Sequence, residues 1–116
     1  MPFVRLDTNQ RIPEEKRASL CAALSRTCAE TLGKPERYVM SVVQDQATIL
    51  QGGVPGPAAF VEVRSIGGLS PSVNEALTQA ICRLLAETLS IPGARVNVNL
   101  IDMPATHWGV DGSTFG

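Results

Sequence analysis

The chain lacks an excess of charge of either sign, and it lacks any long apolar run. Its 116 residues carry 10 Lys and Arg against 11 Asp and Glu, a net charge of −1 at pH 7. This balance argues against a nucleic-acid footprint and against a polybasic membrane surface. No stretch approaches the roughly 20 apolar residues of a membrane span, and the start lacks the basic-then-apolar pattern of a secretory signal. We expect a cytoplasmic protein, with non-classical release left open, that binds neither nucleic acid nor membrane.

Cysteine is scarce, and histidine occurs once. The three cysteines, Cys21, Cys28 and Cys82, form neither a CxxC pair nor a metal-ligand cluster, which predicts reduced thiols in a chain without an export signal. All three fall in predicted helices, where we interpret them as small buried side chains. His107 has no nucleophile pattern around it and is interpreted as a solvated loop residue rather than a general base. The chain also has neither a P-loop nor a G-x-G-x-x-G sequence.

Two helical patterns lie among strand-like runs. Segment 13–32 opens with Pro13 and stops at Gly33, as helices often do. Segment 71–89 follows Ser70, a favoured N-cap residue, and repeats apolar residues at helical spacing. Strands are predicted at residues 2–8, 38–43, 58–66 and 95–103, with a short additional strand at 48–50.

The two halves of the chain match each other at one sequence offset. Pro13 and Pro71 start the two helices, and Arg37 and Arg95 precede the later strands with the same separation. The match indicates an internal duplication within one domain. The domain is predicted to span residues 1–116, with pseudo-repeats at about 2–50 and 58–103.

Each half reads as strand, helix and strand, which predicts a crossover unit with parallel strands. Two such units side by side give an α+β fold, with a four-stranded mixed sheet and two helices on one face. The other face is uncovered, and strand 58–66 shows no all-polar outer side. We therefore expect this face or an edge of the sheet to pack on another subunit in an oligomer.

A proline stands directly after the initiator methionine. Methionine is generally removed when the next residue is small, which would leave Pro2 with a free secondary amine. Burial and nearby cations disfavour the charged form of such an amine and lower its pKa, so it can act as a base near neutral pH. Proline is common at this position, so the amine needs a pocket and a cationic neighbour before it indicates catalysis.

Short motifs along the whole chain carry a resemblance to a known family. They are Met1-Pro2-Phe3, Asp7-Thr8-Asn9, Leu32-Gly33-Lys34-Pro35, Tyr38, Gly52-Gly53, Ser65-Ile66-Gly67, Asn99, Asp102-Met103 and Gly112-Ser113-Thr114-Phe115. In this order and spacing the chain resembles the macrophage migration inhibitory factor and D-dopachrome tautomerase family of the tautomerase superfamily. The resemblance implies a homotrimer whose three sheets form a barrel-like core, with active sites between neighbouring subunits. It also implies a cofactor-free keto-enol tautomerase, with Pro2 as the catalytic base and a small aromatic α-keto acid of the phenylpyruvate type as substrate.

The resemblance also assigns the substrate-binding groups. Lys34 matches the family lysine that binds the substrate carboxylate and keeps the proline unprotonated; the alternative is a lysine that complements a helix dipole. Ile66 matches a position whose backbone N–H contacts the ligand, and otherwise it is an ordinary strand end. Asn99 matches the asparagine that enters the site from the neighbouring subunit, with a strand hydrogen-bond ladder as the alternative. The implied pocket-lining residues are Phe3, Tyr38, Asn97, Met103, Trp108, Val110 and Phe115.

The chain departs from the family at three places. Asn97 stands where mammalian members have a tyrosine, and Trp108-Gly109-Val110 reverses the familiar Val-Gly-Trp order, so we expect an apolar pocket of different shape. The CxxC of some members is replaced by Pro57-Ala58-Ala59-Phe60, which argues against oxidoreductase function. Two other functions stay open. The same proline could serve hydration or dehalogenation of small unsaturated acids, or the chain could be a cytokine-like interaction protein with a weak or vestigial pocket.

Overall fold

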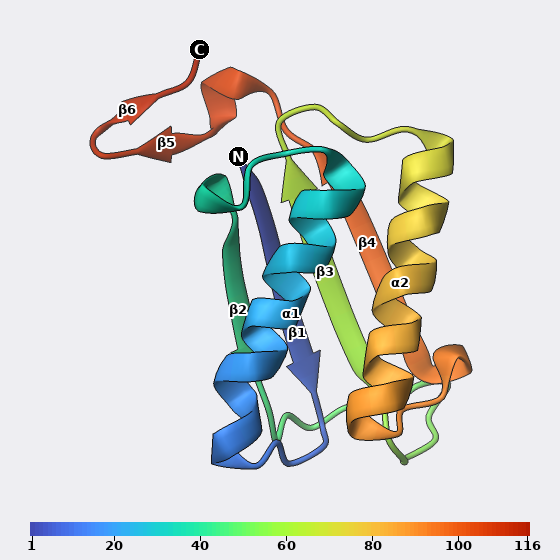
Figure 1. Ribbon diagram of the computed structural model, residues 1–116. Helices are drawn as coiled ribbons and strands as arrows, with labels where there is room; N and C mark the ends of the chain where they lie inside the picture. Colours follow the sequence, from blue (N-terminus) through green and yellow to red (C-terminus); the bar gives the residue numbers. More distant parts are fainter.

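Two helices cover one face of a four-stranded sheet in the computed structural model, which describes residues 1–116 (Figure 1). The sheet order is β2-β1-β3-β4; β1 is parallel to β2, β3 is parallel to β4, and β1 and β3 are antiparallel. This confirms the predicted α+β fold built from two β-α-β units. Neither helix is long and apolar enough to cross a membrane. The elements are β1 (Pro2–Thr8), α1 (Glu14–Leu32), β2 (Met40–Gln44), β3 (Ala59–Ser65), α2 (Pro71–Leu89) and β4 (Val96–Asp102).

Helix α1 ends and helix α2 begins where the sequence predicts. Gly33 adopts a left-handed conformation with φ of 66° after α1, and its N–H donates to the carbonyl of Ala29. The Ser70 hydroxyl accepts a hydrogen bond from the Val73 N–H at 3.2 Å and so caps α2. Gly33 thus fixes where the chain leaves α1, and Ser70 fixes where α2 begins.

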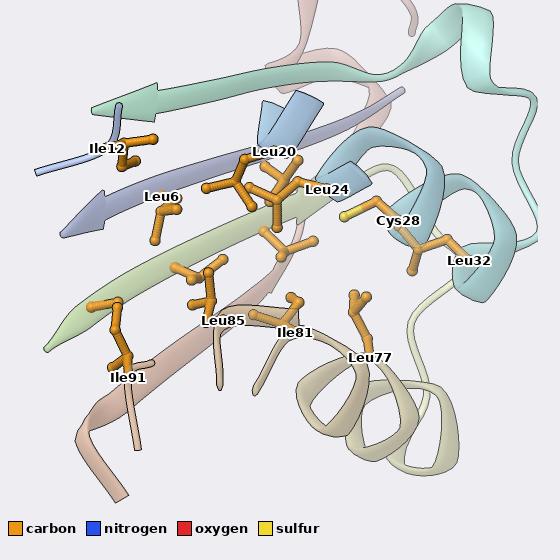
Figure 2. Close-up of a cluster of buried hydrophobic side chains, with 14 residues drawn as sticks. Leu6, Ile12, Leu20, Leu24, Cys28, Leu32, Leu77, Ile81, Leu85 and Ile91 are labelled. Atoms are coloured by element: carbon orange, nitrogen blue, oxygen red, sulfur yellow. The ribbon is translucent and has the colours of Figure 1, made fainter. Parts of the chain in front are cut away.

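The hydrophobic core lies between the helices and the sheet (Figure 2). In β1 and β3, every second residue is buried, including Val4, Leu6 and Val61, so the apolar set of each strand faces the helices. Periodicity alone left this direction undecided. The intervening residues therefore point to the uncovered face of the sheet. Helix residues that complete the core include Leu20, Leu24, Leu77, Ile81 and Leu85.

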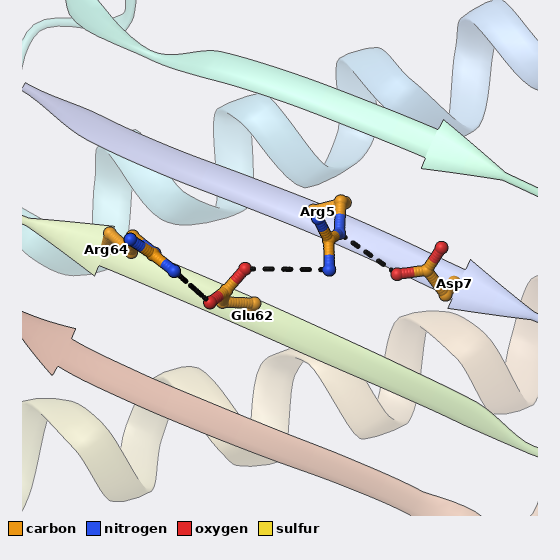
Figure 3. A network of polar contacts seen from close by, with 4 residues as sticks. All are labelled: Arg5, Asp7, Glu62 and Arg64. Carbon is orange, nitrogen blue, oxygen red and sulfur yellow. Dashed lines mark hydrogen bonds and ion pairs between the residues drawn. The ribbon is translucent and has the colours of Figure 1, made fainter.

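The uncovered face carries charges that are paired with one another (Figure 3). Arg5 Nε lies 3.0 Å from Asp7 Oδ2, and Arg64 Nη2 lies 2.7 Å from Glu62 Oε1. Arg5 Nη2 is 3.8 Å from Glu62 Oε2, which links the two pairs. The four charges sum to zero, so this face is mixed rather than strongly charged.

One predicted strand does not form, and several predicted element boundaries are wrong in detail. β2 begins at Met40 rather than 38, because the Tyr38 N–H donates to the Pro35 carbonyl in a short 3-10 turn. No strand forms over 48–50, where the backbone pairs with no neighbouring strand. The remaining differences are single residues at strand or helix ends, as at Pro13, which precedes α1.

A hairpin near the C-terminus was not predicted from the sequence. β5 (Gly109–Val110) pairs with β6 (Ser113–Thr114) through a two-residue Asp111-Gly112 turn. Both turn residues have positive φ, 50° and 82°, the conformation for which Asp-Gly is favoured in tight hairpins. The hairpin extends from the body of the fold on the side where the chain begins (Figure 1).

Cys28 is expected to be unreactive in the folded protein. Its side chain is fully buried, and burial raises the pKa of its thiol to about 12, so almost no thiolate exists at pH 8. The thiol of an unfolded cysteine has a pKa of about 8.5. Because the folded-state pKa is the higher one, we expect the free energy of unfolding to fall as pH rises from about 9 toward 12.

Thiol labelling at pH 8 with mass mapping, and denaturant unfolding at pH 8 and 10, test this expectation. Cys28→Ala should lose the part of the alkaline destabilisation that arises from the thiol. Labelling of Cys28 under native conditions would contradict the buried, neutral assignment.

Candidate active site at the N-terminus

A pocket of about 390 Å³ lies against the start of the chain. β1 occupies the middle of the sheet, and its first residue, Pro2, pairs with Ser65 at the end of β3. The start of the chain therefore meets the turn that follows β3. We call this space the N-terminal pocket; its lining residues are Met1, Lys34, Tyr38, Ile66, Ala105 and Phe115.

Backbone contacts tie the N-terminus to this turn. The Ile66 N–H donates to the Met1 carbonyl at 3.4 Å, and the Lys34 ammonium donates to the Ile66 carbonyl at 3.1 Å. Pro2 is fully buried directly behind Met1. A backbone donor and a lysine ammonium thus lie at the same end of β1 as the amine of the chain.

The environment of the pocket disfavours a charged amine. Burial and, to a smaller extent, the nearby Lys34 cation lower the pKa of the Met1 amino group below its usual value. One wall is Tyr38, whose ring lies 4.6 Å from the Arg37 guanidinium carbon. An amine whose pKa is lowered, beside a cation and an aromatic wall, suits proton transfer on an anionic aryl substrate.

The structure brings only some of the predicted site residues together. Phe3, Met103 and Trp108 line a second hollow of about 380 Å³. The other residues of this hollow are Arg5, Glu62, Arg64, His107 and Gly109. Within one chain, three predicted pocket walls therefore lie in a neighbouring hollow.

Three further predicted residues lie away from the N-terminal pocket of their own chain. Asn97 and Asn99 are exposed on β4, and the Asn97 side-chain amide donates to Gln51 Oε1 at 3.0 Å. Val110 lies in β5 and is exposed. In a single chain these residues contribute nothing to the N-terminal pocket.

Two features near this pocket were not predicted as part of a site. Ala105 lines the pocket, and the Asp102 carboxylate accepts a hydrogen bond from the Gly67 N–H at 3.0 Å. Both follow from the parallel pairing of β3 and β4, which sets Ser65 opposite Asp102. The Asp102-Met103 motif was visible in the sequence, but nothing local to it indicates a bond to a glycine 35 residues earlier.

The fold and the pocket together define the class of protein. Two β-α-β units in one mixed sheet form the fold of the tautomerase superfamily. The amine of this chain lies in a pocket at the start of the inner strand β1. The family model described as macrophage migration inhibitory factor (MIF) matches residues 1–116. The chain therefore belongs to the macrophage migration inhibitory factor family, whose members are typically oligomeric.

Individual relatives agree with this assignment over their full length. The chain is 36% identical over 117 residues to a macrophage migration inhibitory factor homolog from Brugia malayi, covering 100% of both chains. It is 34% identical over 116 residues to the homolog from Trichuris trichiura, covering 99% of this chain and 100% of the relative. The crystal structure of the homologue from Prochlorococcus marinus superposes with a TM-score of 0.93 at 35% identity, covering 98% of this chain and 99% of that one.

Proposed function

We propose that the protein is a keto-enol tautomerase that acts on phenylpyruvate-type α-keto acids with Pro2 as the base. The observation that carries the proposal is the contact of the Ile66 N–H with the Met1 carbonyl, next to the Lys34 ammonium. Removal of Met1 would expose the Pro2 amine and free this N–H for a ligand. A base, a cation and a backbone donor would then face one pocket.

The proposed reaction moves one proton between carbon and oxygen. Lys34 and the Ile66 N–H hold the substrate carboxylate, which places the methylene carbon beside the Pro2 nitrogen. Pro2 takes a proton from that carbon, and the released electron pair forms the carbon–carbon double bond of the enol. The protonated Pro2 amine then gives a proton to the former carbonyl oxygen, which restores the neutral base. Asn99 from a neighbouring copy of the chain donates to the carbonyl oxygen and stabilises its developing negative charge.

The proposed reaction requires the Pro2 amine in its neutral form. Below its pKa the amine is protonated and cannot accept the proton from carbon. Burial and Lys34, which lower the pKa of the chain's amine in this pocket, keep more of it neutral at pH 7. The lysine therefore serves both the substrate carboxylate and the base.

Assembly as a homotrimer is part of the proposal. Met40 and Phe60 lie on the uncovered side of the sheet and are 63% and 38% exposed, so this face offers large apolar side chains to another copy of the chain. Asn99 also lies away from its own chain's pocket, so it can act only in the pocket of another copy. Light scattering at micromolar concentration should give the mass of three chains, and the mass of one chain would refute the trimer.

A second candidate function is a cytokine-like interaction protein with a vestigial pocket. In that case Met1 stays in place, where it lines the pocket and its carbonyl accepts the Ile66 N–H. A chain that retains Met1 has a primary amine displaced from the proline and leaves only binding roles for the pocket. Intact mass of the purified protein tests the tautomerase, because a retained Met1 excludes it; if Met1 is lost, ketonisation kinetics with phenylpyruvate separate the two functions.

A further inference from the structure

Asp102 and Lys34 hold opposite ends of the same peptide group. The Ile66 carbonyl accepts a hydrogen bond from Lys34 Nζ at 3.1 Å, and the Gly67 N–H donates to Asp102 Oδ1 at 3.0 Å. This carbonyl and this N–H belong to one planar amide, in which they point in opposite directions. The amide therefore lies between an ammonium and a carboxylate, and each charge strengthens the hydrogen bond that the other makes.

The preceding peptide group, between Ser65 and Ile66, is also held by a residue at the end of β4. The Ser65 carbonyl accepts from the Met103 N–H at 2.9 Å, and the Ile66 N–H of that amide points to the Met1 carbonyl. The end of β4 thus fixes two successive amides. One presents a donor to the N-terminal pocket, and the other presents an acceptor to Lys34.

The turn that follows has little freedom to move. Ser65 is fully buried, and its hydroxyl donates to the Gly67 carbonyl at 2.6 Å. Gly67 and Gly68 have φ of 72° and 82°, a region that favours glycine. A Cβ on Gly68 would also lie 3.1 Å from Lys34 Cε, so glycine leaves room for the lysine chain.

We propose that Asp102 is a positioning residue that acts on Lys34 and on the Ile66 amide through the Ile66–Gly67 peptide group. This role rests on the proposed tautomerase function. Asp102 does not line the pocket and does not form an ion pair with Lys34, so its effect reaches the substrate only through the peptide. Without the carboxylate oxygen, the Ile66–Gly67 peptide loses one of the bonds that orient it, and the carboxylate-binding pair loses part of its geometry.

Kinetics of Asp102→Ala and Asp102→Asn with phenylpyruvate test the proposal. Both variants remove the charge, but asparagine keeps an oxygen that can accept the Gly67 N–H. We expect Asp102→Ala to raise KM about tenfold with kcat within about threefold, because the lost geometry serves binding of the carboxylate. Asp102→Asn should stay within about threefold of the parent in both constants. Equal KM values for the two variants would overturn the proposal.

Asp45→Ala is the matched control. The Asp45 carboxylate also accepts a backbone hydrogen bond, from the Ile12 N–H at 2.8 Å, but it lies beyond the other end of β1. This variant loses the same side chain and the same kind of bond, together with an ion pair to Arg17 at 3.1 Å, without touching the turn. A rise in KM equal to that of Asp102→Ala would show a general effect of destabilisation and would also overturn the proposal.

An amide measurement keeps the positioning role testable if Asp102→Ala does not fold or the parent has no activity. Absence of parent activity would refute the tautomerase function alone. In nuclear magnetic resonance spectra, Lys34→Ala should shift the Gly67 amide proton and accelerate its hydrogen exchange about tenfold, because the peptide loses its second charged partner. Lys16→Ala should leave this amide unchanged. A Gly67 amide that does not respond to Lys34→Ala would refute the coupling whatever the activity.

Discussion

Replacing Pro2 with glycine is expected to lower the rate of phenylpyruvate tautomerisation about a hundredfold or more. Glycine also permits removal of Met1, so the chain would still begin with an amine at the same place. That amine is primary, and it has lost the ring that fixes its direction toward the substrate carbon. General-base catalysis by a positioned group contributes roughly 10² to 10⁴ in rate, and this contribution is the expected loss. Steady-state ketonisation kinetics measure it.

Pro55→Gly provides the matched control. Pro55 is exposed in the loop between β2 and β3, so this substitution makes the same chemical change away from the pocket. It should retain the parent rate. The Pro2→Gly variant should keep the oligomeric mass of the parent, which shows that the rate is lost through chemistry rather than assembly. Parent-like activity in Pro2→Gly would refute the mechanism.

Replacing Lys34 with alanine is expected to change both the rate and its pH dependence. The loss of a charged donor to the substrate carboxylate should lower kcat/KM at pH 7 by about 10- to 100-fold. The neutral amine is the active form, so kcat/KM should rise with pH through the pKa of the base and then level off. Lys34 contributes to lowering the pKa of the Met1 amino group in this pocket. We expect the same influence on the Pro2 amine that replaces it, so removal of Lys34 should move this midpoint to higher pH. Burial, the larger cause, remains and keeps the midpoint below that of an ordinary amine.

Lys16 provides a matched control for the Lys34 substitution. Lys16 is the only other lysine, and it is exposed on α1. Lys16→Ala should leave the rate and the pH midpoint unchanged. Lys34→Arg keeps the charge and should recover most of the shift in midpoint, although its wider guanidinium fits the Ile66 carbonyl differently. An unchanged pH profile in Lys34→Ala would show that the lysine does not act on the base.

The fold could be predicted from the sequence where local patterns and core burial agree. Segment 71–89 has a capping serine, an apolar stripe and a stop, and α2 has these bounds. Segment 48–50 shows the limit, because β-branched and apolar residues form a strand only when another strand pairs with them. The C-terminal hairpin was missed although its Asp111-Gly112 turn is a hairpin signal, since its strands are only two residues long.

The candidate site was predictable only as far as the family resemblance extends. The resemblance named Lys34 and Ile66, and the structure places both beside the N-terminus. The contact between Asp102 and Gly67 could not be predicted, because it depends on the register of β4 against β3. The resemblance also named Asn99 as a residue that enters the site of a neighbouring subunit. That role stays a prediction, because it requires a second copy of the chain.

The central claim is that the free amine of Pro2 is the base. The most direct measurement compares phenylpyruvate ketonisation by two preparations whose N-termini are established by intact mass, one beginning at Pro2 and one retaining Met1. The proposed mechanism predicts saturable catalysis by the first preparation and a rate near that of buffer for the second. Equal catalysis by both preparations, or no catalysis by the one that begins at Pro2, would contradict it.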